Sequence, residues 1–441
     1  MKTKNAFFFA PVLVIMMGMG MIGSLRNDEP KTISSAAPDR TDYNCVFRTF
    51  FGEEPSDSNF IYKTPAKVAS STGDALAWIS KAQLKNGGWG AGTHARQDVY
   101  DPLAVHADPA TTAMVAMALL RSGNMPTAGK YAANVSLATD YLIKQVENSA
   151  DESANITTET GTQPQRKLGQ NIDVVLTTQY FTNLIDHLDN NPQLKSRIKK
   201  ALDKCVAKIQ SGQNQNGSMR GAGWAGVLQS SFAANALESA KEKGVKVDDS
   251  KLENARNYQK KNYDVKSGSV ATEEAAGVML YSISGTARSS AKEARIAKDN
   301  ISKAKREGKL DKNATVTVDN LKKAGLSDNE AMKYGAAYEV NQAAKIQAQR
   351  SDVMDGFGSN GGEEFLSYLQ TGESMIMSKD IEWKKWYDNI TGKMIRIQNN
   401  DGSWNGHHCI TSPVFCTATA LLILSVNNDV EQLMAMGGKN K

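Results

Sequence analysis

The sequence lacks the short motifs that identify several enzyme classes. It contains no Gly-x-x-x-x-Gly-Lys-Ser/Thr phosphate-binding loop and no Gly-x-Ser-x-Gly segment that would present a serine nucleophile. Charge of one sign is also scarce, because 52 Lys and Arg stand against 47 Asp and Glu in 441 residues. This weak basic bias does not indicate a nucleic-acid partner, and aromatic residues do not alternate with basic ones as they do on nucleic-acid platforms. The composition, 40% hydrophobic and 22% charged, excludes a fibre or a wholly disordered chain.

A long uncharged hydrophobic run occurs at the N-terminus. Lys2 and Lys4 precede the run from Ala6 to Gly23, which is the pattern of an export signal. The run suits a cleaved signal peptide or a retained anchor, because a membrane span needs roughly 17–25 residues. We therefore expect residues 1–25 to export the chain to the periplasm or the cell exterior, and residues 6–25 to hold it to the membrane if they are retained. Residues 26–71 resemble a polar linker, and residues 429–441 a tail.

An internal repeat organises the rest of the chain. Two copies share the spacing Gln-x-x-x-Gly-x-Trp, and a third copy has Met219 in the place of Trp. The three copies contain Gln83, Gly87 and Trp89; Gln398, Gly402 and Trp404; and Gln213 and Gly217. Small-residue apolar segments follow such copies at Pro109–Leu120, Val174–Leu184, Val227–Leu237, Glu273–Tyr281 and Pro413–Leu424. A fixed repeat of this length predicts stacked helical units.

The two segments of each repeat differ in polarity. The first is amphipathic, as in Ser196–Ile209, and the second is apolar nearly all round, which predicts a buried helix. Pro109 and Pro413 suit a first helical turn, with Asp108 and Ser412 as N-caps. Six such pairs predict an all-α, (α/α)6-like toroid over residues 72–428, with the apolar helices inside and the amphipathic helices outside.

The repeated Gln-x-x-x-Gly-x-Trp motif resembles the QW motif of the terpenoid cyclase and protein prenyltransferase α/α-toroid superfamily. The resemblance implies that Gln and Trp join adjacent helix pairs, which is a structural role. It also implies where catalytic acids should be, and they are missing. The segment Phe415–Thr419 resembles the Asp-Cys-Thr-Ala-Glu cyclase motif without either acid, and Asp248-Asp249 lies in a polar linker. Protonation-initiated cyclisation is therefore disfavoured, because a proton donor of raised pKa needs a dry pocket.

Two further features of the superfamily are also weak or missing. Prenyltransferases hold zinc with an Asp-x-Cys pair and a His, but Asp203-Lys204-Cys205 is expected on an outer charged helix. The Gly-Cys-Gly-Glu-Gln thioester motif of the complement-like toroids does not occur. Prenyl transfer and thioester chemistry are therefore not expected.

Polar clusters before the apolar helices predict a site at the mouth of the ring. Its candidate residues are His94, Asp98, Asp101, His106, Asp108, Glu273, Glu274, Glu363 and Glu364, although acidic residues there also suit simple capping of helix N-termini. His407, His408, Cys409 and Cys416 offer good zinc ligands in a spacing that matches no standard signature. A Cys409–Cys416 disulfide and separate free thiols are the alternatives. No cofactor is firmly implied, and zinc is the metal that these residues suggest.

Two insertions interrupt the repeats. Residues 149–170 are polar and predict a loose loop. Residues 287–325 carry eleven Lys and Arg against five Asp and Glu, which predicts either a solvated helical excursion or a docking surface for an acidic protein or anionic lipid. The first functional hypothesis is an exported binding protein for an apolar small molecule, such as a lipid or isoprenoid, or for a peptide. The alternatives are a divergent cyclase-like or metal-dependent transferase or lyase, and a structural protein that binds partners through the basic insertion.

Overall fold

The structure, a computed structural model, describes residues 62–358 and 360–428. The described chain is helical, with isolated bridges in its turns and no β-strand, so the expected all-α class is confirmed. The predicted export segment, most of the linker and the tail lie outside the described residues. In the part that is described, no helix combines the length and the apolarity needed to cross a membrane.

Among the helices of ten or more residues in the described chain, six are buried over most of their length. They are α3 (Pro109–Arg121), α6 (Ile172–Leu184), α8 (Gly226–Glu242), α10 (Met279–Arg306), α14 (Gly362–Met377) and α16 (Pro413–Leu424). Each of these helices contacts the next one along the chain, and the last, α16, contacts the first, α3, so the contacts form a closed cycle. Asp108 and Ser412 cap α3 and α16, and Pro109 and Pro413 occupy the first turns, as the sequence predicts.

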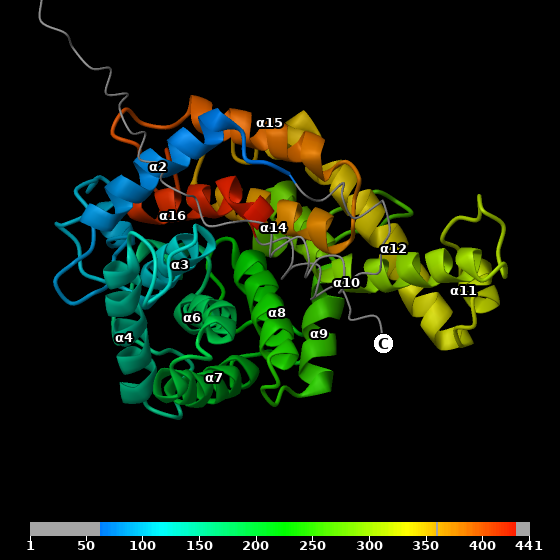
Figure 1. Cartoon of the computed structure of the whole chain (residues 1–441), viewed down its shortest axis with the longest axis horizontal. Helices are drawn as coiled ribbons and strands as arrows, with labels where there is room; N and C mark the ends of the chain where they lie inside the picture. Colours follow the sequence, from blue (N-terminus) through cyan, green and yellow to red (C-terminus); the bar gives the residue numbers. More distant parts are fainter. Residues whose placement is uncertain (1–61, 359, 429–441) are drawn as a thin grey trace, which may run out of the picture. The chain divides into compact units, whose positions relative to one another are not determined.

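Six further helices cover the buried ones, and all but α12 are clearly amphipathic. They are α2 (Ala66–Lys81), α4 (Ala132–Asn148), α7 (Pro192–Ser211), α9 (Asp249–Lys260), α12 (Asp328–Ala348) and α15 (Trp383–Arg396). Each has its main contacts with one buried helix: α2 with α16, α4 with α3, α7 with α6, α9 with α8, α12 with α10, and α15 with α14 (Figure 1). Four of them, α7, α9, α12 and α15, also contact the next buried helix. Short helices α5 (Gln163–Lys167), α11 (Val318–Lys323) and α13 (Ser351–Met354) lie in the connections, with single 3-10 turns at His94–Arg96, Ile185–His187, Glu273–Ala275 and Val426–Asn428.

The repeat motif makes the same hydrogen bonds in all three copies. Each Gln side chain donates from Nε2 to the carbonyl of its own repeat glycine and to a carbonyl of another covering helix. The second acceptors are Asn134, Lys251 and Ser71 for Gln83, Gln213 and Gln398 respectively. The glycines have φ near +90°, a conformation that L side chains rarely adopt, which explains why glycine stands there.

The last residue of the motif, Trp in two copies and Met219 in the third, is hydrogen-bonded to the buried helix that follows the turn. Its backbone N–H donates to a hydroxyl of that helix, and the pairs are Trp89 with Thr112, Met219 with Ser230, and Trp404 with Thr417. The two indoles also donate to Ile79 and Met394 of the preceding covering helix. The motif therefore satisfies buried polar groups at the junction of successive helices.

Gln398, just after the last covering helix α15, is hydrogen-bonded to the first covering helix α2. Its Nε2 donates to the Ser71 carbonyl at 3.1 Å, and its Oε1 accepts from the Ser71 hydroxyl at 2.7 Å. We expect Gln398→Ala to lower the free energy of unfolding by about 2 kcal/mol, because several part-buried hydrogen bonds are lost. Urea denaturation measures the change. Gln193→Ala, on the exposed start of α7, is the control and should change stability by less than about 0.5 kcal/mol.

The basic insertion begins later than the sequence suggests. We expected a helix over Glu273–Tyr281 and an excursion from residue 287, but α10 is one continuous helix from Met279 to Arg306. Its stretch from Ala287 to Ala297 is largely buried against α12 and α14, so the proposed boundary at residue 287 lies inside a core helix. The buried positions of this stretch are mostly alanine and serine, so its composition is that of a solvent-exposed helix. This is why the sequence analysis placed the boundary too early.

Candidate functional site

The first turn of α14 carries a buried carboxylate that is held from four sides. Glu364 accepts hydrogen bonds from the Tyr281 hydroxyl at 2.5 Å, the Gly361 N–H at 2.9 Å and the Phe357 N–H at 3.2 Å. His408 Nε2 lies 3.7 Å from its second oxygen. Burial, with the charge of Glu364 beside it, raises the pKa of Tyr281, so the tyrosine stays a hydrogen-bond donor.

Glu363 lies next to this carboxylate and is equally buried. It accepts a hydrogen bond from the Ile410 N–H at 3.2 Å. Burial, followed by repulsion from Glu364, raises the pKa of Glu363 to about 8. Glu363 and Glu364 form an acidic pair, and the raised pKa favours the protonated form of Glu363, which is the form that a general acid needs. Its side chain is 1% exposed, so a substrate does not reach it in this conformation.

The cysteines near this pair are thiols. Cys205, Cys409 and Cys416 are all free, so the Cys409–Cys416 disulfide is not found, and Cys45 lies outside the described residues. Burial raises the pKa of Cys409 to about 12, with a further contribution from Glu363. Cys416 donates from Sγ to the Ile410 carbonyl. Neither thiol is a ready nucleophile, because the thiolate is the reactive form.

The zinc alternative has no ligand set here. Among residues 62–358 and 360–428, no group of three or more His, Cys, Asp or Glu is placed to hold a metal ion. His407 is exposed and donates its backbone N–H to Asn360, whereas His408 faces Glu364. The two histidines therefore have different neighbours and do not form a shared ligand set for zinc.

Most of the other predicted mouth residues lie at the surface. Asp98 pairs with Arg96, Asp101 accepts from the Leu103 N–H, and the exposed His106 lies 3.9 Å from Glu159. Glu273 and Glu274 are also exposed, and Glu274 accepts from the Tyr258 hydroxyl. His94 is half-buried, and burial lowers its pKa, followed by the nearby positive charges of Lys167 and Arg166. Of the predicted mouth residues, Glu363 and Glu364 therefore lie together in a buried position, whereas most of the others are separate surface residues.

Asp108 and Asp173 are buried acids at the starts of neighbouring helices. Asp108 accepts from the Thr111 and Ala91 N–H groups and from the Thr111 hydroxyl, and burial raises its pKa. Asp173 accepts from the Ile156 and Val174 N–H groups, and burial raises its pKa to about 7. The sequence analysis missed Asp173, although it stands before a predicted buried helix as Asp108 does.

The insertion at residues 149–170 is an ordered cover over this end of the buried helices, not a loose loop. Its helix α5 starts with a capping box between Thr162 and Gln165, a Thr-x-x-Gln signal that the sequence contains. The buried Gln163 side chain accepts from the Thr411 and Ser412 N–H groups just before α16. Its backbone N–H donates to Gly92. One residue thus ties three loops together, and the sequence analysis missed it.

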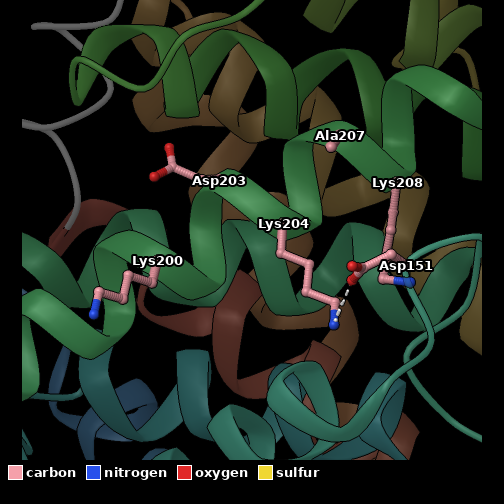
Figure 2. A pocket seen from close by; sticks show the side chains of 6 residues that line it. All are labelled: Asp151, Lys200, Asp203, Lys204, Ala207 and Lys208. Carbon is pink, nitrogen blue, oxygen red and sulfur yellow. Dashed lines mark ion pairs between the residues drawn. The ribbon is translucent and has the colours of Figure 1, made fainter.

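A surface recess of about 460 Å³ lies where this insertion meets α7. It is lined by Asp151, Lys200, Asp203, Lys204, Ala207 and Lys208 (Figure 2). Lys204 pairs with Asp151 at 2.9 Å, and Lys208 donates to the Ala150 and Ser153 carbonyls. Burial lowers the pKa of Lys208, followed by repulsion from Lys204. These lysines anchor the insertion, so the recess is not a convincing ligand site.

Six exposed apolar side chains lie in the loops that precede buried helices or at a helix start. We call them the apolar rim; its members are Tyr100, Leu103, Trp224, Val265, Met279 and Phe357. Trp224 is 63% exposed, and Lys167 Nζ lies 4.1 Å from its ring centroid. Phe357 is 54% exposed, and its ring centroid lies 5.3 Å from that of His408. Lys167 lowers the pKa of Glu363 and His408 faces Glu364, so each of these two aromatic rings lies beside a neighbour of the acidic pair.

The opposite ends of the buried helices are joined by a chain of ion pairs. Arg121 of α3 pairs with Glu373 of α14 at 3.1 Å, and Arg288 of α10 pairs with Glu373 and with Glu238 of α8, both at 3.3 Å. Arg256 of α9 also pairs with Glu238. Each of these carboxylates therefore has two arginine partners, which is the pairing that buried charges need.

Comparison with known proteins gives no relative from which to transfer a function. No protein-family model matches the chain, and no curated protein matches it significantly.

Proposed function

We propose that the chain is an α/α toroid that binds peptides and does not cyclise terpenoids. The closed architecture is supported by the cyclic contacts of the six buried helices and by the hydrogen bonds between Gln398 and Ser71. The repeat motif keeps its resemblance to the terpenoid cyclase and prenyltransferase toroids. Export and membrane anchoring through residues 6–25 remain part of the proposal.

The apolar rim is the observation that carries the binding function. The rim holds six of the large apolar side chains that stay exposed on the described chain, and exposed apolar surface commonly marks a binding site. Aromatic side chains are common anchors of protein interfaces because they bury much area at little entropic cost. Trp224 and Phe357 therefore suit the apolar side chains of an extended peptide, with His408 between the rim and the buried acids.

The interior is less suited to a lipid or isoprenoid. The buried helices carry many hydroxyl and amide side chains, and Ser231 of α8 donates across the interior to Gln370 of α14. An apolar ligand would leave such groups without partners, which costs free energy. The peptide version of the binding hypothesis is therefore favoured over the lipid version.

Fluorescence titration with short synthetic peptides tests this proposal, because Trp224 is largely exposed whereas Trp89, Trp383 and Trp404 are buried. Peptides with aromatic residues should shift the Trp224 emission, and their polar counterparts should not. Trp224→Ala and Phe357→Ala should each weaken binding about tenfold when it is followed by calorimetry.

The matched control is Met332→Ala, which removes an exposed apolar side chain near the start of α12 and not from a loop before a buried helix. It should leave the affinity within about twofold. Equal losses in the rim and control variants, or no binding of any peptide, would reject the rim as a binding site.

An enzyme is the second candidate, and the raised pKa of Glu363 is the observation that favours it. A divergent cyclase-like enzyme or a metal-dependent transferase or lyase would need the loops over α14 to open. Stoichiometric zinc in the purified protein would favour the metal-dependent version over the binding function.

A further inference from the structure

The helix pair α10–α12 is longer than the repeat requires. The other five buried helices have 12 to 17 residues, whereas α10 has 28. Its covering helix α12 has 21 residues, one more than α7, the next longest covering helix. The second half of α10, helix α11 and the start of α12 extend away from the other helices (Figure 1). We call residues 302–325 the hairpin tip.

The hairpin has its own small core, so the tip has a defined shape. Ala297, Ile301, Leu321 and Ala331 are buried together, and Leu310, Val316, Val318, Leu326, Tyr334 and Tyr338 pack against them. Thr317 caps α11 and Ser327 forms a capping box at α12. A folded tip presents its charged side chains at low conformational cost, unlike a flexible basic tail.

Positive charge is concentrated at the tip. Residues 302–325 contain seven Lys and Arg against three Asp and Glu. Local acids offset only some of this charge, as when Lys309 pairs with Glu307 at 2.7 Å and Lys322 with Asp328 at 3.0 Å. Lys312 and Lys323 are exposed, and neither forms an ion pair with any described residue.

The basic residues nearer the ring have a different role. Arg288 and Lys292 of α10 pair with acids of α8, namely Glu238 and Glu242. Their charge serves the packing of the buried helices. The tip therefore carries most of the surplus charge of the insertion, with seven basic against three acidic residues, compared with eleven against five in residues 287–325.

We propose that the hairpin tip is a docking surface for an acidic segment of a partner protein. Charge complementarity of this kind steers association and selects partners. A membrane fits less well, because anchoring needs apolar side chains as well as charge. The exposed large apolar residues of the described chain include none from the tip, whose apolar side chains lie in its own core.

Binding of a short poly-glutamate peptide, followed at low salt by fluorescence anisotropy, tests the proposal. The double variant Lys312→Glu/Lys323→Glu should weaken binding about tenfold and leave the melting temperature unchanged, because both side chains are exposed. The control Lys199→Glu/Lys200→Glu makes the same charge change on exposed positions of α7 and should alter binding less than about twofold.

Three outcomes would overturn the proposal. Equal losses in the tip and α7 variants would mean that only the net charge matters. Binding to phosphatidylglycerol vesicles that depends on Lys312 and Lys323, without binding of poly-glutamate, would assign the tip to a membrane. A dimer that the tip variant dissociates, measured by light scattering, would assign it to a second copy of this chain.

Discussion

Replacing Glu363 with Gln should stabilise the protein at pH 8 by about 3–5 kcal/mol and remove much of its pH dependence. The pKa of Glu363 is raised from the ordinary 4.5 to about 8 in the folded chain. Between these values the folded state keeps a proton that the unfolded state has released. Raising the pH through this window therefore favours unfolding, at up to 1.36 kcal/mol per pH unit.

Urea denaturation at pH 5, 6.5 and 8 measures this effect. Wild-type stability should fall from pH 5 to 8, and Glu363→Gln should fall less steeply. Asp173, whose pKa is raised to about 7, should account for part of the remaining slope, which Asp173→Asn would remove. The exposed Glu152→Gln is the control. A Glu363→Gln variant with the wild-type slope would show that Glu363 is already ionised in the folded protein.

The sequence predicts the helical scaffold well because its signals are local. Pro109 and Pro413 mark first turns, and Asp108 and Ser412 cap them as expected. The expected segment Pro413–Leu424 matches α16 at both ends. The sequence prediction fails where a buried segment has the composition of a solvent-exposed helix. Residues 287–297 contain serine, alanine, lysine and arginine, yet they are core because α12 and α14 supply partners that composition does not reveal.

The candidate site is less predictable because its parts come together only through tertiary contacts. Glu363 and Glu364 are identified from sequence, but Tyr281, a partner of Glu364, lies 83 residues away along the chain. Gln163 and Thr411 are 248 residues apart. The surface position of Asp98 and Glu273 likewise depends on loop paths that no local pattern encodes. Carboxylates before helices predict capping, and only packing decides which of them are desolvated.

The two ends of the buried helices differ in their chemistry. At one end, the acidic pair is held by neutral donors, with Lys167 and His408 nearby, and burial raises the pKa of Glu363. At the other end, full charges are balanced by arginines, as Glu373 and Glu238 are. The first end should therefore contribute to the pH dependence of stability, whereas the second end is a network of paired charges.

Arg288→Met should destabilise the protein by about 3–5 kcal/mol. The Arg288 side chain is 2% exposed and joins Glu238 to Glu373, so its removal leaves two carboxylates in a desolvated position with one partner each. Removing one member of a buried ion network costs more than the bond itself, because the remaining charges stay buried. Thermal and urea unfolding measure the loss.

The control is Arg96→Met, which removes an arginine from an exposed pair with Asp98. Both side chains of that pair are more than two-thirds exposed, and we expect a change of less than about 0.5 kcal/mol. The double variant Arg288→Met/Glu238→Gln should lose less stability than the sum of the two single variants, because both changes remove the same Arg288–Glu238 ion pair. A small effect of Arg288→Met, or additive losses in the double variant, would mean that water reaches this end of the helices and solvates the charges.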